Sequence, residues 1–408
     1  MSLEQVETLI VGGGQAGLAM SHRLGQHGRR HLVLERHRIA ERWRTERWDA
    51  LRFQFPNDQV RLPDFHFPHT DPDGFATRAQ IVDFIESYAI LMKVPVRCGV
   101  EVTRLRRREG APGFRAETSN GPVEAANVVI ATGPYQSPAV PVLLPDDSGI
   151  VQVTANRYRN PAALPAGAVL VVGGGASGAQ LAEELLDAGR RVYLSLSRHR
   201  RGPRRYRGRD FLWWLSALGL DRTPVEQRGP DQSPFVISGA KGGHTIDFRD
   251  FAARGMVLLG RAEPAHDGVM AFAADLADSL ANGDAFHDRF LTLADSHVAG
   301  HRLDMPEDRA ARVRLPDPPC VTDPIRRIEL REAGISTVIW ATGYRYDFDW
   351  IDLPVLDPHG APLHRRGVTD VPGLYFLGLS WLYRMTSSFL SGVGEDAAYL
   401  AEHIARRA

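Results

Sequence analysis

The sequence has almost no cysteine. Among its 408 residues only Cys98 and Cys320 are cysteines, and they lie far apart in the chain. Two isolated thiols exclude a disulfide framework, a cysteine zinc site and the CxxC pair of a dithiol reductase. So low a thiol content fits a reducing compartment, and we expect a cytoplasmic protein.

The chain also lacks a net charge and a long apolar segment. Lys+Arg and Asp+Glu both number 49, so the overall charge gives no support to a polyanionic partner. No apolar run approaches the roughly 20 residues of a membrane helix. Three glycines at positions 12–14 interrupt the place where a signal peptide would have its apolar core. We expect neither a nucleic-acid partner nor a membrane partner.

What the sequence does contain is a glycine-rich turn that occurs twice. The apolar run at 8–11 ends in GGGQAG at 12–17, and the run at 169–172 ends in GGGASG at 173–178. A helical pattern follows each turn and leads to a further apolar run, at 31–35 and at 192–196. A GxGxxG turn between a strand and a helix predicts a dinucleotide-binding βαβ unit, with the pyrophosphate at the helix N-terminus.

The two units differ where their second strand ends. Glu35 lies 23 residues after Gly12, and a carboxylate there accepts hydrogen bonds from ribose hydroxyls, as for NAD or the adenosine half of FAD. The second unit has Leu196, Ser197 and Arg198 at the comparable point and no acid. A hydroxyl and a guanidinium suit a 2′-phosphate. The second unit is therefore predicted to bind NADP(H). The alternative interpretation is that Ser197 and Arg198 are only the solvated end of a strand.

An arginine-rich stretch follows at once. Residues 198–209 contain seven arginines and His199. A nucleic-acid patch is the competing interpretation. Gly202, Pro203 and Gly208 are interleaved with the arginines, which favours a loop beside a phosphate site.

Further patterns complete an α/β chain with two Rossmann-like domains. Apolar runs at 127–133 and 337–343 both end in Ala-Thr-Gly, another strand is predicted at 374–378, and a late helix after 392–396. Residues 265–301 read as mostly helical, with an apolar face formed by Phe272, Leu276, Leu280, Phe286, Phe290 and Leu293. Proline-marked hinges at 161–165 and 316–324 suggest that one domain is inserted into the other.

Taken together, these motifs resemble the flavin-containing monooxygenase superfamily, particularly its compact bacterial flavoprotein oxidoreductases. The resemblance spans nearly the whole chain and includes Trp43-Arg44, Arg47-Trp48-Asp49 and the sequence WATGY at 340–344. It implies an FAD-binding domain formed by residues 1–160 and 318–408, and an NADPH-binding domain formed by residues 161–317. It also implies oxygen activation through a flavin C4a-(hydro)peroxide.

The resemblance assigns roles residue by residue. The FAD pyrophosphate would lie on Gly12, Gly14 and Gly17, with Glu35 at the adenosine ribose, Trp43 and Arg44 along the cofactor, and the backbone of Val102 at the adenine. NADPH would use Gly173, Gly175, Gly178, Ser197 and Arg198. Asn57 resembles the asparagine that hydrogen-bonds near the flavin peroxide, although a turn asparagine after a proline is a competing interpretation. The predicted cofactor-binding set also includes Gln15, Ala16, Arg36, Ala131, Thr132, Gly133, Ser177, Ala341, Thr342, Gly343 and Gly378.

One departure concerns the FxGxxxHxxxY motif of the superfamily. If Tyr158 is its last position, Thr154, Ile150 and Ser148 stand where histidine, glycine and phenylalanine are expected. Only the tyrosine is retained. The missing positions change what we expect for the coupling of the two domains and for the retention of NADP⁺. Both predicted nucleotide sites are unaffected.

The predicted function is an NADPH-dependent flavin monooxygenase that uses O2 on a small organic substrate. Oxidation of a nitrogen or sulfur atom is slightly preferred over Baeyer–Villiger oxidation. The alternatives are an NADPH-dependent reductase or oxidase without oxygen insertion, and a non-catalytic redox sensor. No metal site is predicted, because the pairs His27/His31 and His297/His301 lack an HExxH-type arrangement. The oligomeric state is left open, with a homodimer as one option.

Overall fold

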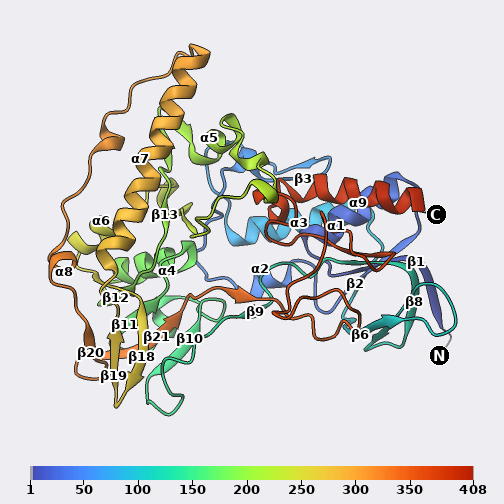
Figure 1. Ribbon diagram of the computed structural model, residues 1–408, viewed down its shortest axis with the longest axis horizontal. Coiled ribbons are helices and arrows are strands. Elements are labelled where there is room, and N and C mark those ends of the chain that lie inside the picture. Colours follow the sequence, from blue (N-terminus) through green and yellow to red (C-terminus); the bar gives the residue numbers. More distant parts are fainter. Residues whose placement is uncertain (1–2, 408) are drawn as a thin grey trace.

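One predominantly parallel sheet organises each of the two lobes of the molecule. The computed structural model describes residues 3–407, and Figure 1 shows one sheet in each lobe, with both ends of the chain in the same lobe. The first sheet has the strand order β5-β2-β1-β8-β7-β6, and β23 pairs with β8. Its strands are β1 (Glu4–Val11), β2 (His31–Glu35), β5 (Val96–Cys98), β6 (Val102–Arg107), β7 (Phe114–Thr118), β8 (Val123–Ile130) and β23 (Leu374–Phe376).

The centre of the first sheet is parallel and fully buried. Val11 of β1 lies opposite Leu34 of β2 on one side and Ile130 of β8 on the other. Strands buried on both faces read as continuous apolar runs, which is why the sequence identifies them. The helices of this lobe are α1 (Gln15–Gln26), α2 (Glu41–Thr45), α3 (Arg78–Leu91) and α9 (Val393–Arg407), and β3 (Arg61–Leu62) and β4 (Phe65–His66) form a short hairpin. Helices α1 and α9, from opposite ends of the chain, lie on the same face of the sheet (Figure 1).

The second sheet repeats this arrangement with the order β10-β21-β11-β12-β17. Val172 of β11 lies opposite Ser195 of β12 and Trp340 of β21. The strands are β10 (Val151–Thr154), β11 (Ala168–Val172), β12 (Val192–Ser195), β17 (Val257–Leu259) and β21 (Ile335–Trp340), and the helices are α4 (Ala176–Asp187), α5 (Phe211–Ala217), α6 (Phe248–Ala253), α7 (Leu276–His301) and α8 (Pro319–Thr322). The α/β class and the two Rossmann-like cores are therefore confirmed.

Short strand pairs complete the second lobe. They are β13 (Arg200–Arg201) with β16 (Phe235–Val236), β14 (Arg205–Tyr206) with β15 (Arg209–Asp210), and a three-stranded sheet of β18 (Ala262–His266), β19 (Val269–Phe272) and β20 (Arg327–Glu329). Strands β10 and β21 of the second sheet lie outside the range 161–317. The division of the chain into an FAD-binding and an NADPH-binding domain stays a prediction. The second sheet extends beyond both ends of the range predicted for the NADPH-binding domain.

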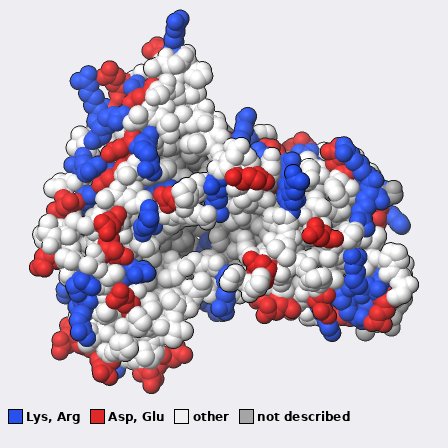
Figure 2. Space-filling view, viewed as in Figure 1, with Lys and Arg blue, Asp and Glu red and all other residues white. Residues whose placement is uncertain are grey.

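The chain crosses between the lobes along a small two-stranded link. Strand β9 (Ser137–Pro138) pairs antiparallel with β22 (Tyr344–Arg345). Each of these strands follows an Ala-Thr-Gly sequence that leaves a central strand. Figure 2 shows a face that is hollowed between the two lobes, with basic and acidic side chains interspersed over both.

The predicted helix over 265–301 is wrong in its first part. Residues 262–272 form the β18–β19 hairpin, and the helix begins only at Leu276. Asp267 (φ 50°) and Gly268 (φ 80°) form the two-residue turn, because Asp-Gly accepts the positive φ values that a tight hairpin needs. Phe272 is consequently a buried strand residue, and Leu293 on α7 is 50% exposed.

Across the described residues, no helix has both the length and the apolar character needed to cross a bilayer.

Candidate functional site

The first glycine turn leaves the N-terminus of α1 open. Gly12 has a φ of 111°, and its N–H donates to the carbonyl of Leu34 at 2.8 Å. A Cβ on Gly17 would lie 1.9 Å from the carbonyl oxygen of Gly12, so only glycine lets α1 approach β1 this closely. A Cβ on Gly14 would meet no atom within 4 Å. The backbone N–H groups at this end are therefore accessible to an anion.

A cavity of about 990 Å³ begins at this turn. It is lined by segments from both ends of the chain, since Gly378 and Ser388 lie against Gln15 and Ala16. The side-chain amide of Gln15 donates to the carbonyl of Ser388 at 2.7 Å. Among the predicted residues, those that line this cavity are Gly12, Gly14, Gln15, Ala16, Glu35, Arg36, Trp43, Val102, Ala131, Thr132, Gly133 and Gly378.

Glu35 is fixed at the end of β2 beside the turn. Its Oε2 accepts a hydrogen bond from the backbone N–H of Gly13 at 2.7 Å, and its Oε1 accepts one from the N–H of His37 at 2.9 Å. An ionised carboxylate has lone pairs left over for two hydroxyl donors. The two backbone hydrogen bonds thereby fix the orientation of the carboxylate at this point of the cavity.

The cavity contains further residues that sequence reasoning missed. Arg42 donates to the carbonyls of Tyr135 and Gln136, the latter at 3.2 Å, and the side-chain amide of Gln136 donates to Thr132 at 3.0 Å. Arg47 stacks on Trp43 with 5.3 Å between its guanidinium carbon and the ring centroid. Arg42 and Arg47 lie close to Trp43 in the sequence, and Tyr135 and Gln136 lie just after the first Ala-Thr-Gly. These four residues could therefore have been predicted from their proximity to the motifs. Asp347, Asp349 and Trp350 also line the cavity and carry no such signal.

Three predicted residues of the first unit are not among those that line the cavity. Gly17 is a packing glycine, and Arg44 forms an ion pair with Glu86. Asn57 lies in a short 3-10 helix, Asn57–Gln59, and its amide donates to the carbonyl of Asp71 at 2.9 Å. Its Oδ1 is buried without a hydrogen-bond partner. The structure does not bring Asn57 to the cavity wall.

These residues fit the adenosine and pyrophosphate of FAD. The fit has three parts: an uncovered helix N-terminus at Gly14, an oriented carboxylate at Glu35, and a cavity large enough for a dinucleotide-sized ligand. The aromatic side of the pocket is formed by Trp43, which packs edge-on against Phe53 with 5.5 Å between centroids.

The second glycine turn has the same backbone as the first. Gly173 has a φ of 111°, and its N–H donates to the carbonyl of Ser195 at 3.0 Å. A Cβ on Gly178 would lie 1.7 Å from the carbonyl oxygen of Gly173. The side chain next to Gly174 is Leu196, and the one next to Gly13 is Glu35. The carboxylate of the first unit is therefore replaced by an apolar group in the second.

Ser197 and Arg198 lie exposed just after β12. The Nε of Arg198 donates to Oδ1 of Asn282 on α7 at 3.0 Å. Ser177 is exposed in the first turn of α4. His199 is buried against Phe248, and this burial lowers the pKa of its imidazole to about 4. Ser177, Ser197 and Arg198 thus remain available to a ligand, whereas His199 is a neutral packing group.

Three of the seven arginines in the arginine-rich stretch form ion pairs with acidic side chains. Arg201 pairs with Asp247 and Asp284 at 2.9 Å each, and the fully buried Arg204 pairs with Asp210 at 2.5 Å. Arg207 likewise pairs with Asp295. These guanidinium groups serve the internal packing of the second lobe, and the clustering of arginines does not by itself indicate a phosphate site.

The second Ala-Thr-Gly sequence supports the second turn. A Cβ on Gly173 would lie 2.4 Å from the carbonyl oxygen of Ala341, just as Gly12 packs against Ala131. Thr342 donates to the carbonyl of Ala139 at 2.6 Å, and Gly343 accepts from the N–H of Ala139 at 2.9 Å. Ala341, Thr342 and Gly343 therefore lie at the second turn and at the link between the lobes.

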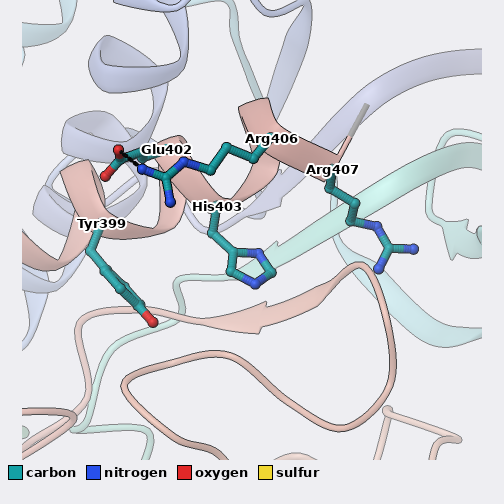
Figure 3. Close-up of a pocket in the computed structure, with 5 residues that line it drawn as sticks. All are labelled: Tyr399, Glu402, His403, Arg406 and Arg407. Atoms are coloured by element: carbon teal, nitrogen blue, oxygen red, sulfur yellow. Dashed lines mark hydrogen bonds and ion pairs between the residues drawn. The ribbon is translucent and has the colours of Figure 1, made fainter.

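A second hollow, of about 320 Å³, lies on α9. It is lined by Tyr399, Glu402, His403, Arg406 and Arg407, and Arg406 hydrogen-bonds to Glu402 at 2.5 Å (Figure 3). None of these five residues belongs to either glycine turn.

Comparisons with known proteins agree with this geometry. The family model described as pyridine nucleotide-disulphide oxidoreductase matches residues 9–222. An uncharacterized CzcO-like oxidoreductase of Geobacillus kaustophilus is 32% identical over 403 residues, covering 98% of both chains. A probable indole-3-pyruvate monooxygenase, YUCCA3 of Arabidopsis thaliana, is 28% identical over 44% of each chain. A flavin-containing monooxygenase from Stenotrophomonas maltophilia has the same fold, with a TM-score of 0.69, 18% identity and 99% coverage of both chains.

Proposed function

The chain belongs to the pyridine nucleotide-disulphide oxidoreductase family, and on that premise we propose that it is a flavoprotein monooxygenase. It would use FAD, NADPH and O2 to oxygenate a small organic substrate, with oxidation of a nitrogen or sulfur atom preferred over Baeyer–Villiger oxidation. The observation that carries the proposal is the pair of equivalent glycine turns, one beside a carboxylate and one beside a leucine, serine and arginine.

The first turn is assigned to FAD. Gly12, Gly14 and the N-terminus of α1 would hold the pyrophosphate, and Glu35 would accept the adenosine ribose hydroxyls. Trp43, Val102 and Gly378 would line the length of the cofactor within the same cavity.

The second turn is assigned to NADPH. Gly173, Gly175 and Ser177 would lie along its pyrophosphate, and Ser197 and Arg198 at its 2′-phosphate. Leu196 offers no carboxylate that would repel this phosphate. The nucleotide-binding units would then be divided near the β9–β22 link, with the second unit running from β10 through β21.

FAD, when bound, would supply the redox chemistry between NADPH and O2. The residues assigned to the two turns would bind and orient the two nucleotides. Asn57 remains a predicted contributor, although it does not line the cavity and its Oδ1 is buried without a hydrogen-bond partner.

The proposal is tested with isotopically labelled O2. The FAD-loaded chain is supplied with NADPH and a panel of amines, sulfides and ketones, and the products are analysed by mass spectrometry. Incorporation of one labelled oxygen atom into a product is expected. NADPH consumption with quantitative H2O2 release and no labelled product would instead identify a reductase or oxidase.

A further inference from the structure

The turn formed by residues 383–389 lies between the first glycine turn and the second lobe. On one side, the side-chain amide of Gln15 donates to the carbonyl of Ser388 at 2.7 Å, and both residues line the cavity of about 990 Å³. On the other side, the N–H of Val225 in the second lobe donates to the carbonyl of Tyr383 at 2.7 Å. The position of this turn therefore sets one wall of the cavity.

The turn rests on the beginning of α9. The hydroxyl oxygen of Ser387 accepts from the backbone N–H groups of Tyr383 and Arg384 at 3.1 and 3.0 Å. The carbonyl of Phe389 accepts from the N–H of Val393, the first residue of α9, at 3.0 Å. These bonds fix the backbone of the turn relative to the helix.

A carboxylate of α9 is buried next to Ser387. The side chain of Asp396 is 0% exposed, and Nε of Arg366 lies 3.6 Å from its Oδ1. Burial raises the pKa of the Asp396 carboxyl, whereas the hydroxyl of Ser387 and the charges of Arg366 and Arg384 act in the opposite direction. Both carboxylate oxygens are buried without a hydrogen-bond partner.

Stability alone does not account for a carboxylate at this position. A buried and incompletely paired carboxylate loses more hydration free energy than its partners return, and an apolar side chain of similar size is often at least as stable. What Asp396 provides is a polar support for Ser387, which is next to Ser388 in the chain. A binding wall that is fixed in advance spares the ligand the cost of ordering it.

We propose that Asp396 is a positioning residue of the FAD site. It supports Ser387, so that the carbonyl of Ser388 receives the amide of Gln15 and holds this side chain at the first turn. The inference rests on the proposed function, because it takes FAD as the ligand of the first turn. Asp396 does not line the cavity, so it acts on FAD only through the bond between Gln15 and Ser388.

The test measures the dissociation constant of FAD for the full-length apo chain by fluorescence titration. Asp396→Asn removes the charge and keeps the size of the side chain. Glu402→Gln, which alters an exposed carboxylate of the same helix, is the matched control. Asp396→Asn is expected to raise the constant about 3- to 10-fold, and Glu402→Gln is expected to leave it unchanged. Equal constants in the two variants would overturn the proposal.

A double-mutant cycle separates positioning from a general loss of stability. Gln15→Ala removes the bond to Ser388 and should itself raise the dissociation constant of FAD. In this background Asp396→Asn should add less than about 2-fold, because the bond that it supports is already absent. The same loss in both backgrounds would mean that Asp396 acts on the whole fold, and no effect of Gln15→Ala would mean that the bond does not serve FAD. Either result contradicts the proposal.

A second variant covers the case in which Asp396→Asn does not fold. Ser387→Ala removes the same support and must show the same loss of additivity with Gln15→Ala. If the unaltered chain does not bind FAD, the proposed function fails, and the positioning is measured by hydrogen exchange of the apo chain. The two backbone N–H groups held by Ser387 must then exchange faster in Asp396→Asn than in Glu402→Gln, and equal rates would contradict the positioning role.

Discussion

Leu196 occupies, in the second βαβ unit, the position that Glu35 occupies in the first. Glu35 follows the residue that pairs with Val11, and Leu196 follows the residue that pairs with Val172. Each side chain packs against the middle glycine of its turn, Gly13 or Gly174. In the proposed assignment, this one position in a repeated fold separates a site for a free ribose from a site for a phosphorylated one.

This relationship predicts the effect of Leu196→Glu. A carboxylate at position 196 would accept from the N–H of Gly174 and repel a 2′-phosphate. The Kd of NADPH is expected to rise about 10- to 100-fold, while NADH binding is retained or improved. Flavin-reduction kinetics with both nucleotides measure the change. Leu196→Gln, which has the same size and no charge, is the matched control, and an equal loss in both variants would refute the electrostatic explanation.

Removal of the carboxylate from the first site is expected to weaken FAD binding. Glu35→Ala deletes the acceptor of two backbone N–H groups and the proposed acceptor of the ribose hydroxyls, so the Kd of FAD should rise about 10- to 100-fold. The flavin content after gel filtration measures the loss. Glu101→Ala alters another acidic residue of the same cavity, one that pairs with Arg36 at 3.8 Å, and is expected to retain most of the flavin. If both variants retain FAD equally, Glu35 is not the ribose acceptor.

Substitutions of two glycines in the first turn should have different effects on stability and on FAD affinity. Gly17→Ala places a methyl group 1.9 Å from the carbonyl of Gly12 and is expected to lower the free energy of unfolding by about 3 kcal/mol. Gly14→Ala points its methyl group into open space and should cost about 1 kcal/mol or less while reducing FAD affinity. Urea denaturation and FAD titration measure the two effects. Similar losses of stability in both variants would contradict the assigned geometry.

The environment of Glu184 on α4 predicts that the free energy of unfolding depends on pH. Burial, followed by the charges of Asp49 and Asp187, raises the pKa of its carboxyl to about 7. The native state therefore binds the proton more tightly than the unfolded state, whose carboxyl has its ordinary lower pKa. The stabilisation of the native state by the protonated Glu184 is complete at low pH. It is lost as the pH rises from about 4.5 to about 7.

Glu184→Gln should remove this dependence. At pH 8 the variant is expected to be more stable than the unaltered chain by about 1–2 kcal/mol, the side chain being partly screened by solvent. At pH 5 the two should be similar. Urea denaturation at both pH values measures the difference, and a variant that is equally destabilised at both would show that Glu184 does not carry a raised pKa.

The sequence was sufficient for the two glycine-turn units because their signals are local. Each has a continuous apolar strand, glycines at fixed spacing and a helix that follows directly. The partners of the arginine-rich stretch were not predictable, since Asp247, Asp284 and Asp295 are brought to it from distant segments. The β18–β19 hairpin was missed because Asp267 and Gly268 stand within an otherwise helical pattern. The approach of Pro234 to Gly175 has no sequence signal, because it depends on how two distant segments pack.

The most direct test of the central claim is anaerobic stopped-flow reduction of the FAD-loaded chain, followed by mixing with O2. Bleaching of the flavin absorbance should be much faster with NADPH than with NADH, because only NADPH carries the 2′-phosphate that Arg198 is proposed to bind. A species that differs from both oxidised and reduced flavin should then persist after O2 is added. Equal reduction by both nucleotides, or no reduction, would contradict the assignment of the second site, and immediate reoxidation with H2O2 release would contradict a monooxygenase.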